Sequence, residues 1–92
     1  MIRENTEFGR FEMDTPAGLA YVAYHCAGDV VYLDHAEVPA ALEGQGVGSR
    51  LVGEVLECLR ARDARIVPVC SFIAAYLRRH PEYEALRARS VG

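Results

Sequence analysis

The sequence predicts an α+β protein: an antiparallel strand meander followed by a helix, a strand and two short C-terminal helices. Three observations predict this fold class. Segments with strand composition fill the first half, the apolar period then changes to that of a helix, and a short apolar run follows the helix. At 92 residues, 51% of them apolar, the chain can bury one core, so we expect a single domain over residues 1–92.

Three segments of the first half have the composition of strands. They are GRFEMD (9–14), LAYVAYHC (19–26) and VVYLDHAEV (30–38). The turns TPAG and AGD separate them at hairpin distances, which favours an antiparallel meander. In the third segment, regular alternation predicts one shared face of the sheet for four residues: Val31, Leu33, His35 and Glu37.

From residue 47 the apolar residues recur at intervals of four and three, which predicts a helix over residues 47–59 with one buried face. Cys58 lies beside this apolar stripe, so we expect it to be buried and unreactive. The apolar run IVPVC (66–70) is typical of a strand buried on both faces, and a helix between two strands implies a right-handed crossover.

Two short helices are predicted after this strand. The first covers SFIAAYLRR (71–79), and its inner side carries Phe72, Ile73, Tyr76 and Leu77. The second begins at Pro81, because proline is favoured at the first position of a helix.

Charge and hydropathy exclude several classes of partner. Ten basic residues, all arginine, stand against 13 acidic ones, and they do not form the clustered positive face that nucleic-acid binding demands. The longest nearly uncharged run, AGLAYVAYHCA, is shorter than the roughly 20 residues of a membrane span, and the N-terminus lacks an apolar signal core. We therefore expect a cytoplasmic protein with no nucleic-acid or membrane partner, present as a monomer or weak dimer.

The three cysteines are Cys26, Cys58 and Cys70. They lie at wide spacings and include no CxxC pair, so the sequence predicts neither a disulfide framework nor a metal site.

The segment GQGVGS (44–49) places three glycines at alternate positions directly before the predicted helix. Glycine permits positive φ and close approach of the backbone to a ligand, and a helix start presents free N–H groups and a favourable dipole. Together these features make an anion site, usually for phosphate. A tight connection without a ligand would use the same residues, so glycine spacing leaves both interpretations open. A P-loop is excluded because the chain has no lysine, and a Rossmann fingerprint because Leu51 stands where its third glycine would be.

Two longer segments carry a resemblance to a known family. AEVPAALEGQGVGSRLVGEVL (36–56) resembles the acyl-CoA-binding segment of the GNAT superfamily of N-acetyltransferases. VPVCSFIAAYLRRHPEY (67–83) is similar to the second half of a short stand-alone branch of that superfamily, and the resemblance covers residues 8–88. It implies a small GNAT-like fold that transfers the acetyl group of acetyl-CoA (coenzyme A) to an amine.

The resemblance also implies the residues that bind the cofactor. They are Val38, Pro39, Gly44, Gln45, Gly46, Val47, Gly48, Ser49 and Arg50. The backbone of the glycine turn would hold the pyrophosphate, and main-chain groups near Val38 would pair with the pantetheine arm as an added strand does. Glu43 stands where the superfamily usually has Gln or Arg, so we expect its side chain to face solvent or cap its own turn.

Acetyl transfer needs a base for the amine proton, donors for the oxyanion and an acid for the departing thiolate. His35 and Glu37 are the candidate bases, since they share a strand face near the expected acyl group. An exposed pair on a half-buried sheet would look the same in the sequence.

Cys70 and Tyr76 are the other candidate catalytic residues. The resembling branch has a cysteine beside the thioester at the place of Cys70, where it accepts the acetyl group or only lines the pocket, and a helix start favours a thiolate. Tyr76 looks like the tyrosine that protonates the CoA sulfur in many GNAT enzymes, and core packing is its alternative role.

We expect direct transfer in preference to a Cys70 acyl-enzyme. The acceptor is a small-molecule or protein amine that the sequence does not identify. Two other classes stay open, a CoA or acyl-CoA binding module with little turnover and a structural interaction domain whose glycine turn binds nothing.

Overall fold

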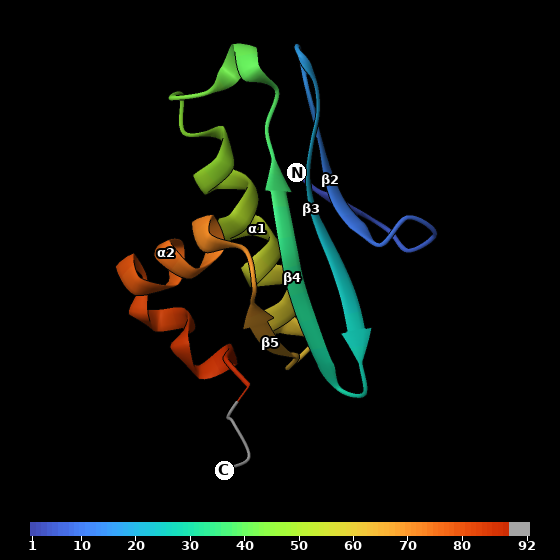
Figure 1. Ribbon diagram of the computed structural model, residues 1–92, viewed down its shortest axis with the longest axis vertical. Coiled ribbons are helices and arrows are strands. Elements are labelled where there is room, and N and C mark those ends of the chain that lie inside the picture. Colours follow the sequence, from blue (N-terminus) through green and yellow to red (C-terminus); the bar gives the residue numbers. More distant parts are fainter. Residues whose placement is uncertain (89–92) are drawn as a thin grey trace.

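A computed structural model describes residues 1–88 of the chain. Its core lies between one face of a five-stranded sheet and the helices that cover that face (Figure 1). The elements, in chain order, are β1 (Arg3–Asn5), β2 (Arg10–Thr15), β3 (Gly18–Ala27), β4 (Val30–Glu37), the 3-10 helix η1 (Ala40–Leu42), α1 (Val47–Ala61), β5 (Arg65–Pro68), α2 (Ser71–Arg79) and the 3-10 helix η2 (Pro81–Leu86). The predicted α+β class, with its meander, helix, strand and C-terminal helices, is confirmed.

The sheet follows the order of the chain. Strands β1 to β4 are antiparallel neighbours, and β5 lies parallel to β4 at the edge because α1 carries the chain back across the sheet. The apolar stripe of α1 supplies five buried side chains to the core: Leu51, Val52, Val55, Leu56 and Leu59. Each fully buried side chain of this kind contributes about 1.5–3 kcal/mol by leaving water.

Several details differ from the sequence-based expectations. The short strand β1 was not expected, because its three polar residues carry no alternation. The last helix begins at Pro81 as predicted but is a 3-10 helix. Strand β5 is not buried on both faces, since it lies at the sheet edge, where only Ile66 is fully buried and Val69 beyond it is 57% exposed.

A bulge in β4 reverses the alternation of its side chains. Tyr24 of β3 pairs with Leu33, whereas Ala23 pairs with His35, so Asp34 is the extra residue. Leu33 and Ala36 consequently both face the core, although they are three residues apart. The prediction that His35 and Glu37 share a face with Val31 and Leu33 is therefore wrong: His35 and Glu37 lie on the opposite, uncovered face.

None of the helices within residues 1–88 is long and apolar enough to cross a membrane.

The contact between η2 and α1 gives a prediction about alkaline stability. The Tyr83 hydroxyl donates to Glu57, and this hydrogen bond, together with burial, raises the pKa of Tyr83 to about 12. Since the folded pKa lies above the usual value, the contact stabilises the fold fully below pH 10, and the stabilisation is lost as the pH rises through 12.

We expect Tyr83→Phe to lower the free energy of unfolding, and we expect its difference from the wild type to shrink between pH 10 and pH 12. Denaturant unfolding at several pH values measures this, with Tyr21→Phe on the uncovered face as the control. A difference that stays constant up to pH 12 would contradict the assignment.

Candidate active site

Strand β4 continues past the end of β5 (Figure 1). The parallel pairing ends at Leu33 and Pro68, and Pro68 has no N–H with which to extend the ladder. The amide of Val69 turns back to the carbonyl of Val67 (3.1 Å), and the amide of Cys70 donates to the carbonyl of Leu33 (3.0 Å). Beyond Leu33, the edge of β4 that faces α2 is therefore unpaired in the described part of the chain.

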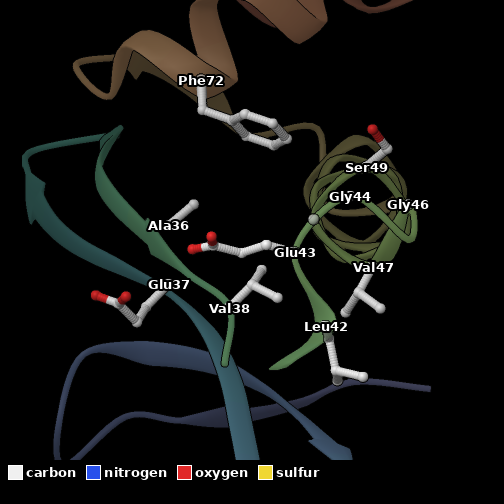
Figure 2. Close-up of a pocket in the computed structure, with 11 residues that line it drawn as sticks. Ala36, Glu37, Val38, Leu42, Glu43, Gly44, Gly46, Val47, Ser49 and Phe72 are labelled. Carbon is white, nitrogen blue, oxygen red and sulfur yellow. The ribbon is translucent and has the colours of Figure 1, made fainter. Parts of the chain in front are cut away.

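A pocket of about 470 Å³ opens beside this free edge (Figure 2). The end of β4, the glycine turn, the first turn of α1 and the first turn of α2 form its wall. The lining residues are Ala36, Glu37, Val38, Leu42, Glu43, Gly44, Gly46, Val47, Gly48, Ser49 and Phe72.

The three glycines of the turn have different physical roles. Gly44 and Gly46 have positive φ (83° and 81°), and a Cβ on either would meet no atom within 4 Å. They make the turn possible and leave open space above the backbone. Gly48 lies within α1 without positive φ, and a Cβ there would lie 3.1 Å from the ring of Phe72. A glycine at position 48 is therefore explained by the close approach of the Phe72 ring and not by its backbone conformation.

The start of α1 is uncapped. Gly46 is the N-cap residue and supplies no side-chain hydrogen bond, and the first helical bond runs from the amide of Arg50 to the carbonyl of Gly46. The preceding amides consequently have no partner within the helix. Because Gly46, Val47 and Ser49 line the pocket, this electropositive helix end opens into it. An anion is the ligand that such an arrangement suits.

The carboxylate of Glu43 occupies another part of the same pocket. Glu43 is exposed, as expected, but Figure 2 shows its side chain extending across the pocket toward β4 rather than away from it. Glu37 also contributes to the pocket wall, but its carboxylate lies on the opposite side of β4 from Ala36. Arg50, predicted to bind the cofactor, does not line it and pairs instead with Glu54 (3.4 Å).

Six of the nine predicted cofactor residues line the pocket, namely Val38, Gly44, Gly46, Val47, Gly48 and Ser49. Pro39 and Gln45 do not: Pro39 precedes η1, and the side-chain amide of Gln45 donates to the carbonyl of Ala41 (3.4 Å).

The two candidate bases, His35 and Glu37, lie beside each other. Nε2 of His35 lies 2.9 Å from Oε1 of Glu37, and both side chains are more than half exposed. The ring of Tyr21 stands beside His35, with 6.4 Å between ring centres. Figure 2 shows the carboxylate of Glu37 on the opposite side of β4 from the methyl group of Ala36. The pair is thus open to a molecule that approaches from the uncovered face of the sheet.

Cys70 and Tyr76 lie at different depths. Cys70 is half-buried at the start of α2, held by its amide at the point where β4 and β5 part. Tyr76 is only 7% exposed and stacks on His80, and its hydroxyl lies 2.8 Å from where a Cβ on Gly53 would be. It opens into a second, shallower pocket that shares Ser49 with the first. Burial, and then the carboxylates of Glu82 and Glu57, raise the pKa of Tyr76, which makes its phenol a weaker proton donor.

The sequence-based search missed Phe72 as a site residue. Helical periodicity placed it on the inner side of α2, yet its side chain is 40% exposed and faces the pocket. Its position two residues after Cys70 was the available signal, because the first turn of a helix lies close to the end of the preceding strand.

Within residues 1–88, no group of three or more His, Cys, Asp or Glu could hold a metal ion.

Comparison with known proteins identifies similar chains. A family model described as GCN5-related N-acetyl-transferase matches residues 10–86, which include every element from β2 to η2. The NMR solution structure of a GCN5-like candidate N-acetyltransferase from Staphylococcus aureus is similar, with a TM-score of 0.73 and 26% sequence identity. The alignment covers 98% of this chain and 89% of that chain. No curated protein sequence matches the chain significantly.

The cysteines give a prediction about accessibility. Cys26 is exposed, whereas Cys58 and Cys70 are half-buried, so the expectation that Cys58 is fully buried is wrong. The sequence predicts Cys70 as the reactive thiol of the three, because it precedes a helix start. From the exposure in the structure we expect instead that a thiol reagent labels Cys26 first and the other two more slowly, because access limits the reaction. Mass spectrometry of peptides from the native protein measures the order, and Cys26→Ser should remove only the fast phase. Faster labelling of Cys58 than of Cys26 would contradict this order.

Proposed function

Because this chain belongs to the GCN5-related N-acetyltransferase family, we propose that it transfers the acetyl group of acetyl-CoA to an amine by direct attack. The amine nitrogen bonds to the thioester carbonyl carbon, the carbon–sulfur bond breaks, the amine proton passes to a base, and the thiolate leaves with a proton from an acid. The observation that carries the proposal is the uncapped start of α1, which opens into a pocket beside the free edge of β4.

The residues of the pocket suit the parts of CoA. The unpaired amides at the start of α1 would hold the pyrophosphate, and the space above Gly44 and Gly46 lets phosphate oxygens approach the backbone. Main-chain groups of residues 36–38, which have no partner strand on that side within residues 1–88, would pair with the amides of the pantetheine arm. The pantetheine arm would then pair with the backbone near Val38 in the way that an added strand pairs with the edge of a sheet.

Glu37 is the proposed base, since it is the member of the pair that lines the pocket. His35 then acts as a positioning residue, because its ring nitrogen holds one carboxylate oxygen of Glu37 at 2.9 Å. A small-molecule or protein amine would approach from the uncovered face of the sheet. Tyr76 of α2 is the proposed acid for the thiolate; its phenol lines the second pocket, and its raised pKa makes it a weaker proton donor than a free tyrosine.

The position of Cys70 favours a second candidate mechanism. Its amide is fixed to Leu33 where β4 and β5 part, so its thiol stands near the proposed thioester site and could accept the acetyl group before the amine does. The exposure of His35 and Glu37 favours a further candidate, an acyl-CoA-binding module with little turnover. We also propose that the chain belongs to the short stand-alone branch of the superfamily typified by N-acetyltransferase domain-containing protein 1, which its residues 67–83 resemble.

Release of free CoA thiol in the presence of a panel of amines tests the proposal. Glu37→Gln should lower the rate by about 10² to 10⁴ fold, the usual contribution of a general base. Cys70→Ala should retain measurable turnover. His25→Gln is the matched control. His25 is also an exposed histidine beside a carboxylate, with its Nδ1 2.6 Å from Oδ2 of Asp34, but it lines neither pocket.

Two results would contradict direct transfer. An acetyl adduct on Cys70, formed from acetyl-CoA without acceptor and discharged by amine, would establish the acyl-enzyme route. Tight CoA binding without release of CoA by any amine would favour the binding module.

A further inference from the structure

Tyr21 belongs to a row of side chains that crosses the uncovered face of the sheet. Pairing of β1 with β2 places Arg3 opposite Glu12. Pairing in the rest of the sheet places Tyr21 of β3 opposite Glu12 on one side and Glu37 on the other. Directly paired residues share a face, with their Cβ atoms about 4.5–5.5 Å apart. The row therefore connects the first strand with the proposed base.

Glu12 is a buried carboxylate within this row. Its side chain is only 4% exposed, although no helix covers this face. Its carboxylate oxygens lie 3.2 Å from a guanidinium nitrogen of Arg3 and 2.7 Å from one of Arg10, and the side-chain amide of Asn5 donates to it (3.1 Å). A buried charge needs such partners. Because Nε of Arg10 also donates to Glu12 (2.9 Å), the guanidinium is held along its edge.

Arg10 in turn contacts the ring of Tyr21. The central carbon of its guanidinium lies 4.9 Å from the ring centre of Tyr21 and 5.0 Å from that of Phe8. A guanidinium at these distances is attracted to the faces of both rings. Phe8 is 65% exposed and lies outside the core, so Arg10 is the contact that explains its ring. The buried carboxylate thus fixes Arg10, and Arg10 fixes Tyr21.

Tyr21 also contacts His35. Their ring centres are 6.4 Å apart and their planes meet at 62°, which is the edge-to-face arrangement that aromatic rings prefer. Nε2 of His35 lies 2.9 Å from Oε1 of Glu37. Both of these side chains are more than half exposed, so burial does not restrict their rotamers. The ring of Tyr21 supplies the restraint on His35 that burial does not.

We propose that Tyr21 is a positioning residue for the general base. Its ring, fixed by Arg10, orients His35, and the imidazole then orients the carboxylate of Glu37. This inference rests on the proposed function, in which Glu37 takes the amine proton. Tyr21 lines neither pocket, so its effect falls on the proton transfer and not on the binding of acetyl-CoA.

The rate of CoA thiol release, with an amine that the wild type acetylates, separates positioning from binding. We expect Tyr21→Ala to lower kcat by about 10 to 10² fold, because misplacement of a reacting group by about 1 Å has a cost of this size. The KM for acetyl-CoA should not change. Tyr21→Phe keeps the ring and should keep the wild-type rate.

Tyr32→Ala is the matched control. Tyr32 lies on the same face, since the neighbouring Leu33 faces the core, and its ring stacks on a different histidine, His25, with 4.7 Å between ring centres. Loss of this ring should leave kcat unchanged. Circular dichroism should show that all variants are folded, because neither tyrosine belongs to the buried core.

The imidazole signals of His35 test the contact without any reaction. An aromatic ring shifts the resonances of protons that lie close to it. In ¹³C–¹H spectra we expect Tyr21→Ala to shift the His35 signals and Tyr21→Phe to leave them in place, whereas Tyr32→Ala should shift those of His25 instead. Arg10→Gln removes the cation that fixes the Tyr21 ring, so it should shift the His35 signals and lower kcat as well.

Three outcomes would overturn the inference. An unchanged kcat in folded Tyr21→Ala would show that the base needs no support from the ring. An equal loss of kcat in Tyr32→Ala would show that the effect is not specific to Tyr21. Unchanged His35 signals in Tyr21→Ala would show that the ring does not orient the histidine.

Failure of the proposed function gives a different result. A wild-type protein that releases no CoA with any amine would overturn acetyl transfer, and with it the role of Tyr21 in that reaction. His35 signals that still shift in Tyr21→Ala would then show that the contact exists and that the assigned chemistry was wrong.

Discussion

The end of hydrogen bonding between β4 and β5 determines the rest of the site. Pro68 cannot donate to the ladder, and the amide of Cys70 makes the last bond, to Leu33. From that point β4 keeps β3 on one side but has no partner on this edge within residues 1–88, while the segment after β5 turns into α2. One physical fact, the loss of a strand partner, thus produces a free backbone edge, a space beside it and a cysteine fixed at the point of divergence. The uncapped start of α1 faces the same space because the connection over residues 38–46 returns the chain to the end of β4 before α1 begins.

The bulge at Asp34 determines which side chains of β4 face the core and which face the uncovered side of the sheet. Before the bulge Leu33 faces the core, and after it Ala36 does, so His35 and Glu37 face outward. The small side chain of Ala36 leaves room in the pocket, and the titratable pair stands on the uncovered face. In the proposed reaction this arrangement lets acetyl-CoA enter from the helix side and the amine from the opposite side. The two reactants would then meet at the edge of one strand.

The elements that depend on local pattern could be predicted from the sequence. Helix α1 begins at Val47 as its apolar period predicts, and α2 has the predicted bounds. The glycine turn and the end of β4 were also expected to lie together. The bulge was missed because His35 and Glu37 were assigned to a single alternation with Val31 and Leu33; the available signal was the change of apolar positions from 31 and 33 to 36 and 38. The distinct role of Gly48 depends on Phe72, which is distant in the sequence, and the exposure of Phe72 depends on how α2 packs against α1. Tertiary contacts, and not local preference, decide these features.

The central claim is that CoA lies between the start of α1 and the free edge of β4, and NMR titration of ¹⁵N-labelled protein with CoA tests it most directly. The account predicts large shifts for the amides of residues 36–38 and 44–49, because these groups would bond to the arm and the pyrophosphate. Amides of the hairpin between β3 and β4, at the other end of the sheet, should stay in place. Shifts confined to the shallow pocket around Glu54 and Tyr83, or an unchanged spectrum at saturating CoA, would contradict the account.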